Sequence, residues 1–381
     1  MLIPAAMHDF LHGEGYWDQE LALHQISLAA ARRAGDRLGQ ARALMLLSDP
    51  QLSTGDRAAS VASMEQGLAL FRDLGHQVGQ ASALNGLSYT YKVSGDYRSA
   101  TASCQQALEL FRGLGNRRGQ AHALSNLGAV QQETGDYPAA AASLQQALKL
   151  SRDPDDLYCQ CIALQELSAV QRLTGDYRAA AATLTQAHAV NHELGDHYEE
   201  ALLFSQLGAL QRLTGDCRAA IASQQQALEV LSELGEPTAQ GLARNELGLA
   251  QQETGDYDGA AASHQQALRL LRGAGEPYGQ AQVLNSLGQL ASRTSDTGQA
   301  RDHHSQALAI AREIGAPLQE ARALEGLGHS HLHDAHPSDA STHLQQALAI
   351  YQRIRSPAAQ RVQETLSRHG LPLTPTQPAH D

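Results

Sequence analysis

Three observations predict an all-α fold, an α-solenoid of stacked antiparallel helix pairs. A Gly-Asp pair begins at residues 55, 95, 135, 175, 215 and 255, so the chain repeats every 40 residues. Within one period, apolar residues recur twice at helical spacing. Aromatic residues make up only 4% of the chain and hydrophobic residues 42%, which suits an aliphatic, alanine-rich core between close-packed helices.

Residues 118–133 and 137–152 represent the two helices of each unit. Gly135 suits the left-handed residue that closes the first helix, and Asp136 is a favoured N-cap for the second. Weaker units keep the register with Ser295-Asp296 and Ala335-His336 at the same positions. Prolines at the start of three first helices, where the initial turn tolerates them, are Pro237, Pro277 and Pro317.

The repeat predicts one elongated domain over residues 1–370 rather than several globular ones. A partial unit covers 1–35, in which residues 2–13 form a degraded helix, and full units cover about 38–355. A capping helix over 357–369 covers the last apolar face of the array. The proline-rich remainder, 371–381, is expected to be disordered.

The order of small and apolar residues resembles the tetratricopeptide repeat (TPR), in a long subclass of 40 residues per unit. The matching signature positions in one unit are Leu124, Leu127, Gly128, Ala140, Leu144 and Ala147. The phrases TGDYRAA, QQALEL and LGNRRGQA are similar to the C-terminal TPR arrays of actinomycete antibiotic-pathway regulators of the SARP/NB-ARC type. This resemblance implies a sensor or partner-binding array without the DNA-binding segment and nucleotide switch of those regulators.

The resemblance also implies that first helices line a concave groove and that eight units make about one superhelical turn. Polar residues at i, i+3, i+4 spacing on these helices are then candidates for a partner-binding groove, with asparagines as clamps on a peptide backbone. The candidates are Asn85, Tyr89, Lys92, Ser125, Asn126, Gln132, Gln165, Arg172, Ser205, Arg212, Asn245, Asn285 and Arg293. The alternative is that they form an ordinary polar helix surface.

The charge of the chain is concentrated in its centre. The net charge is −12, and residues 121–280 carry −11 of it. Such a chain is not expected to bind nucleic acid directly, which requires clustered basic residues. A partner protein or peptide with basic character would be steered to the centre, although an acidic, solubilising convex face explains the same numbers.

A polar seam interrupts the core pattern in three consecutive units. Gln224, His264 and His304 occupy a column that is apolar elsewhere, and Arg244 replaces a leucine. They could form a hydrogen-bonded ladder and a pocket for an anionic small molecule. The alternative is a partly exposed seam in which Arg244 extends its charged end into water.

Histidines are concentrated in the last unit. His329 and His333 stand at i, i+4 on one helix, a spacing that a metal ion can bridge. No third ligand is fixed by local spacing, so they form a weak metal candidate. The four cysteines, Cys104, Cys159, Cys161 and Cys217, are not spaced as a zinc site, and we expect reduced structural thiols.

No pattern in the sequence predicts catalysis or a cofactor. There is no nucleophile elbow, HExxH or Ser-His-Asp order, and neither lysine, Lys92 or Lys149, belongs to a phosphate-binding loop. We therefore expect a protein that is not an enzyme. With no signal peptide or apolar run of membrane-spanning length, we also expect a cytoplasmic protein that does not enter a membrane.

Three functions remain open from the sequence. The first is a scaffold or regulatory module that holds a segment of a partner protein, in transcriptional or signalling regulation. The second is a metabolite sensor that controls a regulator, and the third is an enzyme on a helical-repeat frame. Homodimerisation through an uncapped N-terminal face is a further possibility.

Overall fold

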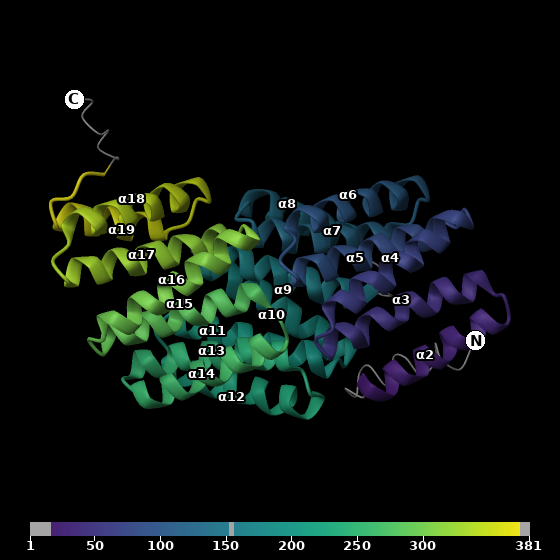
Figure 1. The fold of residues 1–381 in the computed structure, drawn as a ribbon, viewed down its shortest axis with the longest axis horizontal. Coiled ribbons are helices and arrows are strands. Elements are labelled where there is room, and N and C mark those ends of the chain that lie inside the picture. Colours follow the sequence, from purple (N-terminus) through teal and green to yellow (C-terminus); the bar gives the residue numbers. More distant parts are fainter. Residues whose placement is uncertain (1–16, 152–155, 374–381) are drawn as a thin grey trace.

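The computed structural model describes residues 17–151 and 156–373, and it forms helices and no strands over those ranges (Figure 1). Each repeat is a first (A) and a second (B) helix. The A helices are α3 (Arg37–Ser53), α5 (Gln77–Val93), α7 (Arg117–Glu133), α9 (Leu157–Leu173), α11 (His197–Leu213), α13 (Pro237–Thr254), α15 (Pro277–Arg293) and α17 (Pro317–His333). The B helices are α4 (Arg57–Asp73), α6 (Tyr97–Gly113), α8 (Tyr137–Leu150), α10 (Tyr177–Leu194), α12 (Cys217–Leu234), α14 (Tyr257–Gly273), α16 (Thr297–Ile314) and α18 (Pro337–Arg353). The all-α solenoid of paired helices is confirmed.

Repeated turn chemistry sets the helix boundaries. Gly135 has a φ of 81° and closes α7, and the Asp136 side chain accepts a hydrogen bond from the Ala139 amide at the start of α8. Ser295 and Ala335 take the same left-handed conformation, with φ of 64° and 56°, where the repeat has lost its glycine. The turn is thus imposed by the packing of the helices even where the sequence no longer favours it.

The two ends of the array depart from the repeat. Residues 2–13, predicted to form a helix, lie outside the described residues, and the first described helix is α2 (Trp17–Arg33). At the other end, α19 (Ala358–Arg368) lies within the predicted capping helix and buries Val362 and Leu366. Most of the predicted tail also lies outside the described residues. No described helix is long and apolar enough to span a membrane.

The A helices form the inner layer of the solenoid. Successive A helices contact one another directly, from α3 and α5 through to α15 and α17, while each B helix packs on the A helices of its own and the next repeat. This nested arrangement bends the stack because the inner layer is packed more tightly than the outer one. The stack therefore curls into a superhelix with the A helices inside.

The superhelix closes on itself sooner than predicted. Arg57 Nε donates to the carbonyl oxygen of Ala274, 217 positions away, at 2.9 Å. A Cβ built on Gly95 would lie 2.8 Å from Ile314, and one built on Gly135 would lie 2.6 Å from Ile354. One turn thus takes a little over five repeats, not eight, and the second turn packs against the first (Figure 1).

A hydrophobic contact between the two turns buries residues that would otherwise face water. The first residue of the B helix is a tyrosine in several repeats. Tyr97 and Tyr137, over which the second turn lies, are 5% and 1% exposed, whereas Tyr257 is 40% exposed. Tyr137 shares a core cluster with Leu318, Leu324 and Ile354 of the second turn. The turns are therefore held together by core clusters that contain residues of both turns.

We predict that Tyr137→Ala destabilises the protein by about 3 kcal/mol, because it empties a fully buried aromatic site between the turns. Tyr257→Ala is the matched control, since it removes the same side chain from the same repeat position where no second turn covers it. Urea unfolding followed by circular dichroism gives both free energies of unfolding. Equal losses for the two variants would mean that the turns do not pack together in solution.

Candidate functional site

The A helices form the inner layer of the superhelix, and we define the lumen as the space that this layer surrounds in both turns. Tyr89 on α5 is 44% exposed, yet the surrounding protein raises the pKa of its hydroxyl. Carboxylates on other helices, Glu236, Asp49 and Glu199, raise it further. A side chain that touches water but is enclosed by protein on several sides lies in a confined, water-accessible space, which is suited to holding a ligand.

Three tyrosines from three A helices interact electrostatically and form what we call the lumenal tyrosine group, Tyr89, Tyr158 and Tyr198. Burial raises the pKa of Tyr158 and of Tyr198, and Tyr89 contributes to both shifts across the space. The sequence predicted only Tyr89. The repeat could have revealed the other two, since Tyr158 and Tyr198 stand 40 residues apart, at the same position near the start of α9 and α11.

A half-buried lysine lies beside this group. Lys92 Nζ is 5.3 Å from the centre of the Tyr89 ring and 3.9 Å from Glu133 Oε1. Burial raises the pKa of Glu133 to about 7, with Lys92 acting in the opposite direction. The predicted groove residue Lys92 therefore lies in the lumen, but its charge is already shared with a neighbouring carboxylate.

Three arginines form a second group on the lumenal side, Arg172, Arg212 and Arg322, the lumenal arginine group. Arg212 is paired with Glu246, with Nη2 to Oε2 at 3.2 Å. Arg172 and Arg322 form no ion pair with a described residue, and both interact electrostatically with Glu246. Burial lowers the pKa of Arg172, and the charges of Arg212 and Arg322 add to this effect. The group carries more positive charge than its one glutamate balances.

The predicted asparagine clamps are engaged within the protein. Asn126 Nδ2 donates to Asn85 Oδ1 at 3.1 Å, joining α7 to α5. Asn245 and Asn285 are 0% and 2% exposed and bond to histidines of their own repeats. This corrects the prediction for Asn245 and Asn285, because their side chains have no surface to offer a partner.

The remaining predicted groove residues fall into different environments. Ser125 is buried and donates to Ala121 O, while Gln165 donates to Glu199 Oε2 at 2.5 Å. The Ser205 carbonyl accepts from Gln224, and Arg293 forms an exposed ion pair with Glu253 at 3.0 Å. Gln132 is half-buried. Gln165, the Ser205 carbonyl and Arg293 thus join neighbouring helices, whereas the Ser125 bond lies within α7.

The three column residues of the predicted polar seam are fully buried and form no ladder, whereas Arg244 is half-buried. Gln224, His264 and His304 are each 0% exposed and bond within their own repeats, to Ser205 O, Asn245 Oδ1 and Asn285 Oδ1 respectively. The structure thus corrects the ladder, and it corrects the partly exposed seam for these three residues but not for Arg244.

The histidine rings of the seam fill the space that an anion would need. A Cβ built on Gly248 would lie 2.7 Å from the His264 ring, and one built on Gly288 would lie 2.5 Å from the His304 ring. The anion pocket predicted for these residues therefore has no room. Arg244 Nε is buried and forms no hydrogen bond with a described residue.

Among the described residues, the weak metal candidate gains no third ligand. His329 and His333 lie beside different carboxylates, Glu325 at 3.8 Å and Asp334 at 3.6 Å. Within the described parts of the chain, a group of three metal-ligand side chains occurs elsewhere, at His122, Asp156 and Cys159. The sequence missed this group because its members come from two helices.

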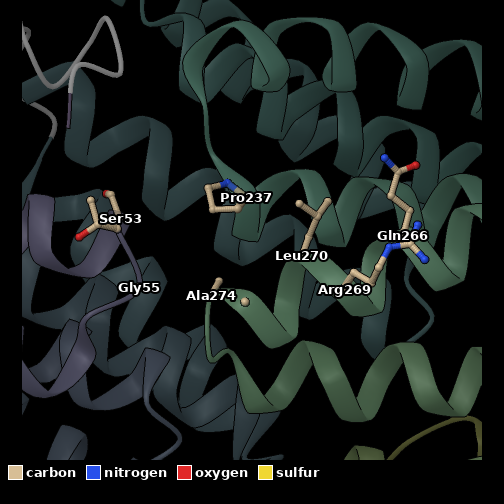
Figure 2. Close-up of a pocket in the computed structure, with 9 residues that line it drawn as sticks. Ser53, Gly55, Pro237, Gln266, Arg269, Leu270 and Ala274 are labelled. Atoms are coloured by element: carbon tan, nitrogen blue, oxygen red, sulfur yellow. The ribbon is translucent and has the colours of Figure 1, made fainter. Parts of the chain in front are cut away.

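A separate pocket of about 350 Å³ lies at the contact between the two superhelical turns (Figure 2). Ser53, Thr54 and Gly55 line one side of it, and Leu270 and Ala274 of the second turn line the other. It contains none of the predicted site residues. Its position shows that the contact between the turns is tight at the hydrophobic core and looser at this edge.

The central acidic charge is divided between two locations. Asp136, Asp176, Asp216 and Asp256 are exposed N-caps in the turns before B helices. Glu133, Glu166, Glu199 and Glu246 instead belong to A helices, where they influence the lumenal groups described above. Both interpretations of the charge pattern therefore have residues that fit them.

Comparison with known proteins agrees with this architecture. The tetratricopeptide repeat family model matches residues 79–153 and 238–313, so these segments carry TPRs. No curated protein sequence matches the chain. The narrower resemblance to actinomycete regulators stays a prediction.

Several solved structures share the fold at low sequence identity. A Rap protein complexed with competence and sporulation factor is similar with a TM-score of 0.66 and 13% identity, over 93% of this chain and 98% of that one. The apo form of RapI is similar with a TM-score of 0.56 and 14% identity, over 71% of this chain and 97% of that one. A Signal Transduction ATPase with Numerous Domains (STAND) protein with a TPR sensor, from Pyrococcus horikoshii, is similar with a TM-score of 0.50 and 13% identity. The match covers 92% of this chain and 55% of that one. At these identities the similarity establishes the fold alone.

We predict that stability falls as the pH is lowered from about 6.5 to 4, because burial lowers the pKa of His264 and of His304 to about 4. The unfolded chain binds these protons at higher pH than the native state does. Each histidine therefore lowers the free energy of unfolding by on the order of 3 kcal/mol as the pH falls through that range. His264→Leu with His304→Leu should flatten this part of the pH profile in urea unfolding.

Leucine fits the repeat position of His264 and His304, since Leu144 and Leu344 occupy the same position in other repeats and pack against Gly128 and Gly328. His197→Leu, which alters a side chain that is 77% exposed, is the control and should keep the wild-type slope. An unchanged slope in the double variant would contradict the burial of neutral histidines.

Proposed function

We propose that this protein is a regulatory binding module that holds an extended segment of a partner protein in its lumen. The observation that carries the proposal is the closure of the superhelix, which encloses the lumenal tyrosine and arginine groups. Tyrosine supplies a large contact area at low entropic cost and is enriched at binding hot spots. An enclosed groove can surround such a segment and exclude water from its polar contacts.

The charges of the lumen suggest the chemistry of the segment. Arg172 and Arg322 lack ion-pair partners among the described residues and suit an acidic side chain or a carboxylate. The carboxylates of Asp49 and Glu236, near the tyrosine group, suit basic side chains. We therefore propose a partner segment that carries both signs, with its basic part over the tyrosines. This retains the predicted basic character for one part of the segment.

The solved structures of the same fold are compatible with such a role. One of them is a complex of a Rap protein with competence and sporulation factor, and another is a STAND protein whose TPR part is described as a sensor. We propose by analogy that occupation of the lumen regulates a signalling or transcription factor inside the cell. The lumenal carboxylates are unfavourable for a phosphate backbone, so we propose no direct binding of nucleic acid.

The proposal predicts that the protein selects peptides of mixed charge from a random phage-displayed library. Arg172→Glu with Arg322→Glu should weaken the binding of the selected synthetic peptides at least tenfold, because an attractive contact becomes repulsive. Fluorescence anisotropy of labelled peptides measures the dissociation constants.

Arg178→Glu is the matched control, since it reverses an exposed arginine on the B helix α10. It should leave the affinities unchanged. Failure to select any peptide, or selected peptides that bind the lumenal double variant as tightly as the wild type, would refute the proposal.

A further inference from the structure

We propose that His122, Asp156 and Cys159 form a zinc-binding site at the contact between α7 and α9. One potential ligand atom from each residue, a ring nitrogen, a carboxylate oxygen and the thiol sulfur, lies within 4.8 Å of the other two. His122 Nε2 is 3.7 Å from Asp156 Oδ1. Nitrogen, oxygen and sulfur ligands together suit Zn²⁺ better than Mg²⁺ or Ca²⁺, which prefer oxygen alone.

The spacing is close to what a tetrahedral ion requires. Zinc bonds of about 2.0–2.3 Å place neighbouring ligands roughly 3–4 Å apart. The cluster therefore needs side-chain movements of only about an ångström to close around the ion. His122 is partly open to solvent, with 27% of its side chain exposed, while Cys159 is fully buried. The ion can thus enter from the side of His122.

Asp156 behaves unlike the other aspartate N-caps of the described helices. Asp36, Asp56, Asp96 and the equivalent aspartates accept a hydrogen bond from the third amide of the helix they precede. Asp156 makes no such bond, and neither of its buried carboxylate oxygens has a hydrogen bond with a described residue, although the residue is only 5% exposed. A buried carboxylate that makes no N-cap hydrogen bond is available as a metal ligand.

Arg118 balances this carboxylate from the solvent side. Its Nε lies 3.3 Å from Asp156 Oδ1, and its side chain is 66% exposed. Because it is long and solvated, it can turn into water when a divalent cation takes its place. The arginine therefore does not block the site.

The thiol of Cys159 is not an activated nucleophile. Burial raises the pKa of Cys159 to about 12, with the charge of Asp156 adding to the effect. Papain-like reactivity requires a lowered pKa, so the raised pKa favours a ligand role for this thiol over a nucleophilic one. A zinc ion replaces the thiol proton, which leaves to solvent as the sulfur–zinc bond forms.

The site is particular to one contact between neighbouring A helices. The same contact in the next repeat joins Gln165 to Glu199, and a later one joins Asn285 to Gln319. Here it places Ser125 Oγ 3.9 Å from Cys159 Sγ. Three protein ligands leave a fourth position for water. The ring of Tyr158, a member of the lumenal tyrosine group, lies 6.3 Å from that of His122, so His122 is close to this group.

The test is a titration of the metal-free protein with Co²⁺, which reports thiolate ligation by a near-ultraviolet charge-transfer band. We expect one equivalent to bind, the band to appear, and Zn²⁺ to displace it. Cys159→Ser should abolish the band, and His122→Ala and Asp156→Asn should each weaken binding at least tenfold. Circular dichroism verifies that each variant remains folded.

Cys161→Ser is the matched control, because Cys161 is also buried on α9 and its pKa is also raised to about 12. It should keep the band, as should His329→Ala with His333→Ala. The proposal is overturned if no band forms, if the band survives Cys159→Ser, or if Cys161→Ser removes it equally. None of these outcomes depends on whether the lumen binds a peptide.

Discussion

The packing of the second superhelical turn against the first is the contact on which the rest of the structure depends. Tyr97 and Tyr137 are buried only because the second turn covers them, and Arg57 bridges the turns by donating to Ala274 O. Repeat arrays ordinarily gain stability from neighbouring repeats alone. Here, contacts between residues more than 200 positions apart make the array a closed body, and they convert an open groove into an enclosed lumen.

Enclosure explains the electrostatics of the site. Side chains from α5, α9 and α11 interact across the lumen, so that Tyr89 raises the pKa of Tyr158 and of Tyr198 although it is far from them in sequence. The same enclosure leaves Arg172 and Arg322 near one glutamate, Glu246. A ligand that supplies the missing negative charge would gain from the reduced solvent screening there.

The fold could be predicted from the sequence because each repeat carries its own turn signals, such as Gly135 and Asp136, at a constant interval. The site could be predicted only in part. Repeat columns identify which residues face inward, but not which are already bonded, so Asn245 and Asn285 were indistinguishable from Tyr89 and Arg172. Contacts between repeats, such as His122 with Asp156 and Cys159, and contacts between turns depend on the superhelical pitch, which no local pattern encodes.

The distance between the two turns tests this account most directly. Spin labels at Thr134→Cys and Arg355→Cys, both exposed positions, flank the contact between Gly135 and Ile354. Cys217→Ser removes the partly exposed native cysteine, since the other three are buried. The account predicts strong dipolar broadening of the frozen-solution spectrum of the doubly labelled protein. A spectrum equal to the sum of the two singly labelled proteins would show that the superhelix is open, and would contradict the enclosed lumen.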